Sequence, residues 1–175
     1  MSERTEQRGL EDQHGLEVRR ASSPAEIEAA GRVVAAAYEA DAYASADYRS
    51  RLGQAQDRAD NAELLVAVDT DGAVLGSVTY SLAGQPYAEV SRPGEAEFRM
   101  LGVAPAARGR GVGEALVQAC LDRARRDRVS AVAICTMQEM TAAQAIYRRL
   151  GFVRDSERDW QPIPTIQLLG FVRPL

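Results

Sequence analysis

The sequence predicts a mixed α/β fold in which helices cover the faces of a central sheet. Three features predict it. Short apolar runs typical of strands alternate with helical patterns, an Asp71-Gly72 turn signal joins two of these runs, and three alternating glycines link a strand to a helix. Strands and helices that alternate along one chain favour a sheet with helices on its faces. At 175 residues and 46% hydrophobic content, the chain can form one domain with a sizeable core.

The N-terminal part is expected to contain a leader, a strand and two helices. Residues 1–15 are polar and lack periodicity, which predicts a flexible leader before a domain over residues 16–175. Residues 16–20 form a short strand. Ser23 is an N-cap with a proline behind it, so a helix with apolar residues at helical spacing begins there. A second, more polar helix is expected over residues 45–59.

A hairpin of two strands is expected next. Residues 64–68 read as a buried strand, and residues 73–82 are its partner. Apolar and polar residues alternate in the partner, which predicts one packed face and one wetter face: Val78, Tyr80 and Leu82 against Ser77, Thr79 and Ser81. Residues 83–94, with two prolines, are expected to form a loop.

The C-terminal half is expected to contain two strand–helix pairs followed by two final strands. Pro105 closes the first strand, Gly151 ends the second helix, and a loop with Pro162 and Pro164 separates the last strands. The expected ranges are 98–103 with 114–127, 131–135 with 141–150, then 152–155 and 166–172.

The glycine-rich turn between the first of these strands and its helix predicts a seat for a phosphate or diphosphate. It reads Arg108-Gly109-Arg110-Gly111-Val112-Gly113. Alternating glycines let backbone amides approach an anion, and the following helix directs its free N–H groups at the same point. The spacing misses the dinucleotide fingerprint by one position, and a P-loop is excluded because the chain has no lysine. A turn that binds nothing is the alternative.

Composition argues against several classes of function. The net charge of −4 and a pI near 5.2 argue against nucleic-acid binding. No apolar run reaches transmembrane length and no signal-peptide core is present, so we expect a cytoplasmic protein without a membrane partner. The single histidine, His14, and two cysteines, Cys120 and Cys135, are too few for a multi-histidine metal site; no metal is expected. We expect the cysteines to be core thiols.

Two motifs at a characteristic spacing resemble those of the GNAT superfamily of N-acetyltransferases. The run Arg108-x-x-Gly111-x-Gly113 follows Leu101-Gly102-Val103-Ala104-Pro105, which matches the family's LxVxP sequence. The later box Tyr147-x-x-x-Gly151-Phe152 matches its YxxxGF sequence. The resemblance covers about residues 16–160 in element order and is sharpest over 97–155.

The resemblance implies a GNAT-like acyl-CoA N-acyltransferase fold in which strands four and five splay apart and acetyl-CoA enters the gap. The diphosphate would sit on the amides of the glycine turn, and the pantetheine arm would pair with the exposed edge of the splayed strand. The implied donor-binding residues are Leu101, Gly102, Val103, Arg108, Gly109, Arg110, Gly111, Val112, Gly113, Glu114 and Thr141.

Two side chains are the implied catalytic residues. Tyr147 would protonate the leaving thiolate, because a phenol with a pKa near 10 stays protonated at neutral pH; core packing is the alternative. Glu97 would be the base, directly or through water. Strand alternation puts Arg99 on the same face, so a surface ion pair of these two is the other interpretation, and the amine could instead lose its proton to solvent.

Relatives commonly carry an asparagine seven residues before the tyrosine, where this chain has Met140. Methionine cannot make the amide's hydrogen bonds, so Thr141 or a nearby backbone group would have to replace them. The acceptor would lie across the sheet, beside the first helices, the 83–94 loop and the C-terminal hairpin. Its expected wall residues are Tyr43, Tyr48, Tyr87 and Trp160, with Asp159 and Glu97 for a cationic amine.

The function implied is transfer of an acetyl group from acetyl-CoA to a primary amine of a small molecule or peptide. Two alternatives stay open: a catalytically silent acyl-CoA sensor, which Met140 favours, and a transferase acting on a protein N-terminus or lysine. A longer acyl group is a further variant. Similar proteins frequently pair through C-terminal strands, which allows a homodimer.

Overall fold

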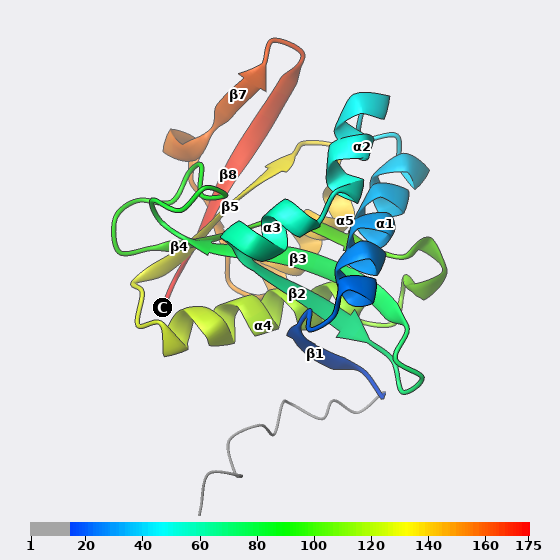
Figure 1. Cartoon of the computed structure of the whole chain (residues 1–175). Helices are drawn as coiled ribbons and strands as arrows, with labels where there is room; N and C mark the ends of the chain where they lie inside the picture. Colours follow the sequence, from blue (N-terminus) through cyan, green and yellow to red (C-terminus); the bar gives the residue numbers. More distant parts are fainter. Residues whose placement is uncertain (1–14) are drawn as a thin grey trace, which may run out of the picture.

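A mixed sheet flanked by helices forms the core of the chain, as the computed structural model shows for residues 15–175 (Figure 1). Residues 1–14 of the predicted leader lie outside the described residues. In the described part the sheet has eight strands: β1 Glu17–Arg20, β2 Glu63–Val68, β3 Val74–Leu82, β4 Ala96–Val103, β5 Ala131–Met137, β6 Val153–Arg154, β7 Trp160–Ile163 and β8 Ile166–Pro174. The helices are α1 Pro24–Ala40, α2 Ala46–Gly53, α3 Gln56–Asn61, α4 Val112–Arg126 and α5 Thr141–Arg149.

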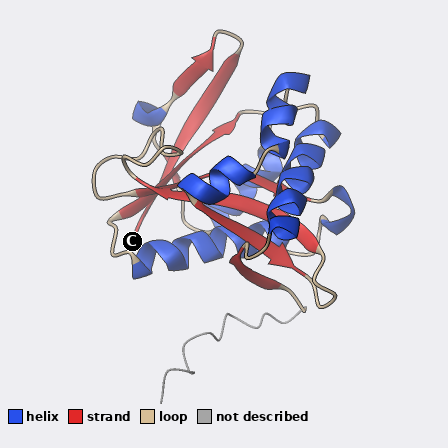
Figure 2. Ribbon diagram, viewed as in Figure 1, coloured by secondary structure: helices blue, strands red, loops and turns tan. Residues whose placement is uncertain are grey.

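The strand order is β1-β2-β3-β4-β5-β8-β6, and β7 pairs with the N-terminal part of β8. The β4–β5 pair is parallel and the remaining pairs are antiparallel. Figure 2 shows helices on both sides of this sheet. The predicted fold class is confirmed.

Helices bury both faces of the central strands. Strand β2 shows this, because its side chains alternate between two apolar clusters. Leu64 and Val66 pack with Ala30 of α1, while Leu65 and Ala67 belong to the larger cluster that includes Leu116, Val117, Cys120 and Leu121 of α4. The wet face predicted for β3 is wrong for the same reason: Ser77, Thr79 and Ser81 are at most 1% exposed.

Strands β4 and β5 separate soon after they meet, which confirms the predicted splay. They pair only at Ala96 with Val132 and at Glu97 with Ala133. Beyond that point β4 remains paired with β3, but an extra residue interrupts the register, so that Thr79 faces Arg99 while Ser77 faces Gly102. Met100 lies in the left-handed region with φ 54° at this bulge. A bulge bends its strand, and here it accompanies the divergence of β4 from β5.

The single helix predicted over residues 45–59 is wrong, because the chain breaks between α2 and α3. A Cβ on Gly31 of α1 would collide with the carbonyl oxygen of Gly53, so α1 and α2 cross at backbone distance. Gln54 then leaves the helical region, with φ −88° and ψ 75°. The buried Arg58 of α3 donates to the carbonyls of Arg51 (3.4 Å) and Leu52 (2.7 Å). This side chain therefore caps the end of α2 together with the Gln54 N–H, which bonds to the Arg51 carbonyl over 3.1 Å.

Strand β7 was predicted as loop because it contains Pro162. The strand pairs only with β8, so a residue without an N–H is tolerated on its outer edge. The other helices and strands begin and end within a few residues of the predicted positions. The largest shift that concerns the cavity is at α4, which begins at Val112 rather than at residue 114.

Candidate functional site

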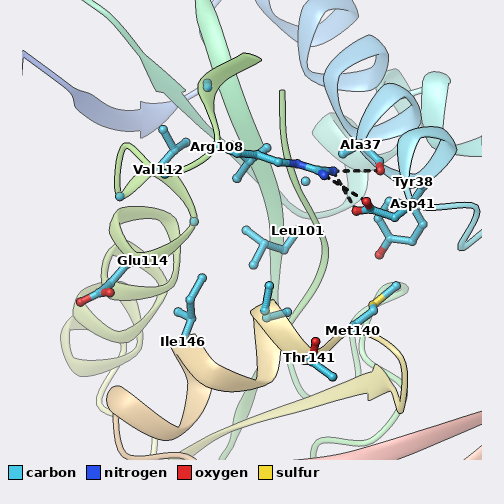
Figure 3. A pocket seen from close by; sticks show the side chains of 18 of the residues that line it. Ala37, Tyr38, Asp41, Leu101, Arg108, Val112, Glu114, Met140, Thr141 and Ile146 are labelled. Carbon is cyan, nitrogen blue, oxygen red and sulfur yellow. Dashed lines mark hydrogen bonds and ion pairs between the residues drawn. The ribbon is translucent and has the colours of Figure 1, made fainter. Parts of the chain in front are cut away.

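A cavity of about 540 Å³ lies where β4 has left β5 (Figure 3). The glycine turn, the first residues of α4 and α5, the end of β4 and the end of α1 form its walls. Every predicted donor-binding residue lines it except Arg110, which is exposed outside the lining. One cavity therefore brings together residues that lie up to 40 positions apart in the chain, from Leu101 to Thr141.

The three glycines of the turn have different structural roles. Gly109 and Gly111 adopt φ 76° and 77°, and a Cβ on either would meet no atom within 4 Å. Only bare backbone therefore faces outward at these two positions. Gly113 is needed for packing instead, because its Cβ would lie 3.1 Å from Cδ1 of Ile146 in α5.

Two helix N-termini face the cavity without capping side chains. Gly111 is the N-cap of α4 and Met140 the N-cap of α5, and neither position has a side-chain cap hydrogen bond. The first N–H groups of both helices consequently lack intrahelical partners and carry partial positive charge. Val112, Gly113 and Glu114 line the cavity at α4, and Thr141 lines it at α5 with the next two alanines. This arrangement suits a ligand with anionic or carbonyl oxygens.

The side chain of Met140 points toward the end of β5, the strand that precedes α5. The hydroxyl of Thr136 donates to its sulfur over 3.4 Å. The Thr141 N–H bonds to the Glu139 carbonyl over 2.8 Å, but methionine offers no side-chain cap to the next N–H groups of α5, whereas an asparagine is among the strongest N-caps.

Two ion pairs cross the edges of the cavity. Arg108 donates from Nη1 to Oδ1 of Asp41 over 3.0 Å and from Nη2 to Oδ2 over 2.8 Å, and its Nη2 also reaches the Ala37 carbonyl at 3.4 Å. Figure 3 shows this side chain extended across the cavity toward the end of α1. On the other side Arg149 of α5 donates to Glu114 of α4 over 2.8 Å.

Strand β4 contributes its unpaired edge. Leu101, Gly102 and Val103 line the cavity beyond the last residue that pairs with β5. On the other face α1 lies directly on this part of the strand, since a Cβ on Gly102 would stand 2.9 Å from Cα of Val34. The backbone groups on the free edge are available to a ligand that carries amides.

Tyr147 lies in an aromatic cluster beneath the cavity and not in its lining. Its ring centroid is 5.8 Å from those of Phe98 and Phe152 and 6.5 Å from that of Phe171. The side chain is buried, and this burial raises the pKa of the phenol well above its usual value. The neighbouring Ile146 does line the cavity, so the ring is one residue away from its wall.

Glu97 is buried at 1% exposure, and one of its two carboxylate oxygens accepts three backbone N–H bonds. Its Oε2 accepts N–H bonds from Glu89 (2.8 Å), Val90 (2.8 Å) and Ser91 (2.9 Å), all in the loop before β4. Arg99 pairs with Glu89 at 3.3 Å, which replaces the ion pair with Glu97 considered from the sequence. The carboxylate therefore anchors the loop.

The expected acceptor residues are also engaged elsewhere. Asp159 accepts from Arg154 over 2.5 Å and from the N–H of Gly170 over 2.8 Å. The hydroxyl of Tyr87 bonds to Asp57 of α3. Tyr43 lines the cavity itself, and its hydroxyl donates to the Glu139 carbonyl over 3.3 Å. Of the expected acceptor residues, Tyr43 alone lines this cavity.

The sequence reasoning missed the wall that α1 supplies, together with Arg149. Ala37, Tyr38 and Asp41 line the cavity from α1. No motif marks them, because their position depends on how α1 crosses β4. Arg149 lies within the YxxxGF box and could have been found from its helical spacing to Ile146.

Residues 15–175 lack two further features that would bear on function. No group of three or more histidine, cysteine or acidic side chains there could hold a metal ion. None of the helices in this part of the chain combines the length and apolar character that crossing a membrane requires.

Comparison with known proteins gives two kinds of relative. Mycothiol acetyltransferase of Pseudarthrobacter chlorophenolicus is 37% identical over 109 residues, which cover 62% of this chain and 32% of that protein. The enzyme of the same name from Cellulomonas flavigena is 38% identical over 112 residues, 63% of this chain and 31% of the relative. The chain thus spans about a third of the length of these curated relatives.

Solved structures share the fold over nearly the whole chain. A GCN5-related N-acetyltransferase from Kribbella flavida superposes with a TM-score of 0.62 at 29% identity and covers 92% of this chain and 98% of its own. A GNAT-family acetyltransferase from Staphylococcus aureus gives 0.70 at 12% identity, with 91% and 99% covered. The model of the acetyltransferase (GNAT) family matches residues 28–152, which include the splayed strands, the glycine turn and the YxxxGF box. The chain belongs to the acetyltransferase (GNAT) family.

Proposed function

We propose that this chain transfers an acetyl group from acetyl-CoA to a primary amine of a small molecule or peptide. The observation that carries the proposal is the cavity into which two uncapped helix N-termini and an unpaired strand edge open. A CoA thioester presents the matching groups, namely a diphosphate, two amides and a carbonyl. The name shared by the curated relatives supports acetyl as the transferred group.

The glycine turn and α4 would hold the diphosphate. Amides at Gly109, Gly111, Val112 and Gly113 are unobstructed or belong to the uncapped first turn. Several N–H groups aimed at one anion bind it without a lysine. Arg110 is exposed beside this turn and would contact phosphate only from outside.

The free edge of β4 and the start of α5 would hold the pantetheine arm. Leu101 to Val103 offer N–H and C=O groups on the side that β5 has left. Thr141 and the uncapped amides of α5 would provide the polar contacts that Met140 cannot make. A backbone N–H near Leu101 would polarise the thioester carbonyl.

Tyr147 would act as the general acid. The acceptor's neutral amine attacks the thioester carbonyl carbon, the C–S bond breaks, and the phenol donates its proton to the sulfur as the thiolate leaves. Burial keeps the phenol protonated far above neutral pH. Because the ring is packed beneath the cavity wall, a small movement of Ile146 or of the donor's sulfur has to bring the two groups together.

Glu97 would support the site structurally and not as the base. Its Oε2 accepts three backbone N–H bonds, so proton abstraction by this atom would disturb the loop that they hold, and the buried side chain is not part of the cavity lining. An acceptor in its ammonium form would therefore lose one proton to solvent before attack. The attacking nitrogen would lose a second proton afterwards, and the phenolate of Tyr147 would regain its proton from solvent.

Calorimetry and a thiol-release assay test the proposal. Titration of coenzyme A into the folded protein should release or absorb heat with one-site stoichiometry. Acetyl-CoA with an amine panel should release thiol, and Tyr147→Phe should lower kcat about 100-fold, within the usual range for a general acid, with an unchanged Kd for coenzyme A. Phenylalanine keeps the aromatic packing, so the melting temperature controls for folding.

The outcomes separate the alternatives. Absence of heat on titration would reject the donor site. Binding without thiol release on any amine would favour a silent acyl-CoA sensor, and release only with peptides bearing a free N-terminus or lysine would favour a protein acetyltransferase. A Tyr147→Phe variant with wild-type kcat would remove the tyrosine from the chemistry.

A further inference from the structure

The Arg108 guanidinium is already occupied in this chain, and its partner comes from a distant helix. Both oxygens of Asp41 accept from it, at 3.0 and 2.8 Å, and the Ala37 carbonyl accepts at 3.4 Å. Asp41 is the C-cap of α1, so the negative end of that helix adds to the attraction. The arginine is the side chain of the glycine turn that extends across the donor cavity (Figure 3).

The segment that carries Asp41 is fixed on both sides of the cavity. Asp41 contacts the glycine turn through Arg108, and two residues later Tyr43 bonds to the Glu139 carbonyl before α5. Ala42 between them has φ 54°, a conformation that is unfavourable for a residue with a Cβ. A locally unfavourable turn thus directs a carboxylate into a cavity that otherwise presents helix N-termini.

A carboxylate in this place competes with a phosphate for the same guanidinium. Arginine binds both groups in the same bidentate geometry. A bound diphosphate near the turn would also be repelled by Asp41 unless the carboxylate moves away. We propose that Asp41 sets the affinity for the donor: it holds Arg108 in the empty protein, and the donor's diphosphate must displace it. This inference rests on the proposed acetyl-CoA site.

The proposal predicts tighter binding when the competing charge is removed. Asp41→Asn should lower the Kd for coenzyme A about fivefold, the size expected from a partly exposed bidentate ion pair of about 1 kcal/mol. The side chains of Arg108 and Asp41 are 43% and 33% exposed, so solvent already screens the pair. Pantetheine, which lacks the diphosphate, should bind the variant and the wild type equally.

A matched control is available on the same helix end. Glu39→Gln makes the same change in charge two residues earlier, at a side chain that is 68% exposed, lies outside the cavity lining and forms an ion pair with Arg49 at 4.0 Å. It should change the Kd less than twofold. The decisive comparison is the double variant: in an Arg108→Ala background, Asp41→Asn should change the Kd less than twofold, because the arginine through which Asp41 mainly acts is gone and only direct repulsion of the diphosphate remains.

The measurements are calorimetric titrations with coenzyme A and with pantetheine, after thermal melts have shown that each variant folds. An Asp41→Asn variant that binds coenzyme A as the wild type does, or more weakly, overturns the role of Asp41. If Asp41→Asn lowered the Kd for coenzyme A by the same factor in the Arg108→Ala background, the role of Asp41 would also be overturned, because the effect would then come from long-range repulsion alone. These results leave the donor site intact, whereas a wild-type protein that binds no coenzyme A rejects the donor site and this inference with it.

Discussion

At the scale of single residues, the loop before β4 depends on one buried carboxylate. Glu97 collects the N–H groups of three consecutive loop residues on one oxygen atom. From the other side Arg158 donates to the Val90 carbonyl over 2.9 Å and pairs with Glu95 at 2.7 Å. The loop is therefore clamped by one anion and one cation, both nearly inaccessible to solvent.

We expect Glu97→Ala to destabilise the protein by roughly 3 kcal/mol. The substitution leaves three N–H groups without their acceptor, and each buried unsatisfied donor costs about 1–3 kcal/mol, less where water can reach it. Urea unfolding measures the loss. Glu97→Gln is the matched variant: it keeps an acceptor oxygen, so it should lose less than half as much and keep kcat within a few-fold of wild type. A well-folded Glu97→Gln protein with kcat reduced 100-fold would identify Glu97 as the base instead.

The sequence located Glu97 but could not show its partners. Its position at the start of β4 follows from the strand pattern, and so does its closeness to the splay. Its hydrogen bonds depend on the path of the 83–95 loop, which no periodicity encodes. The same holds for Asp159, whose carboxylate is used by Arg154 and the Gly170 N–H.

At the scale of elements, the ends of the helices show where local sequence and structure disagree. Arg128 follows the C-cap of α4 and adopts φ 58°; its N–H bonds to the Arg125 carbonyl, and the Val129 N–H bonds to the Ala124 carbonyl. This pattern normally carries glycine at the left-handed position. Arg128 is exposed, so no side-chain packing compensates.

We expect Arg128→Gly to stabilise the protein by about 0.5–1 kcal/mol. Glycine removes the cost of a Cβ in the left-handed region, although it increases the entropy of the unfolded chain. Arg126→Gly is the control, since it makes the same change in charge inside α4, where glycine lowers stability. Chemical denaturation at pH 7 gives both values. A loss of stability in Arg128→Gly would show that the arginine makes a contribution that outweighs its backbone conformation.

The elements that the sequence predicted well are those with a strong local signal. The N-cap at Ser23, which accepts from the Glu26 N–H over 3.2 Å, fixed the start of α1. The break between α2 and α3 escaped prediction because it follows from the contact of Gly31 with Gly53 across two helices. Strand β7 was not predicted, because its proline is tolerated only at the edge position that the strand has in the assembled sheet.

At the scale of the whole molecule, the cavity combines a predictable half with an unpredictable one. The glycine turn, the β4 edge and α5 could be assigned from two continuous motifs. The wall from α1 could not, because Asp41 meets Arg108 across 67 positions of sequence. That contact requires α1 to lie on Gly102 of β4, which is a consequence of the assembled fold.

Carboxylates in ion pairs occur at both ends of the fold and determine how its stability responds to acid. Arg158 lowers the pKa of Asp155, and it lowers that of Glu95 against the opposing effect of burial. Arg154 lowers the pKa of Asp159. At the other end Arg19 of β1 binds both oxygens of Glu26 in α1, at 2.6 and 3.0 Å, and this pair with the Ser22 N–H lowers the pKa of Glu26 to about 2.

These lowered pKa values predict that stability falls as the pH drops from about 4 to about 2. A carboxylate whose pKa is lower in the folded state than its unfolded value near 4 contributes fully above pH 4, and the contribution disappears as the pH falls through the folded value. Glu26→Gln should therefore cost about 1 kcal/mol at pH 7, a figure reduced for solvent screening, and almost nothing at pH 2. Glu28→Gln is the control, because Glu28 is 72% exposed and its one ion pair within residues 15–175 is with Arg32, which is 64% exposed. Urea unfolding at several pH values measures the difference between the variants. If the Glu26→Gln deficit persisted unchanged at pH 2, the side chain would act through packing and not through its charge, and the junction of β1 with α1 would not be electrostatic.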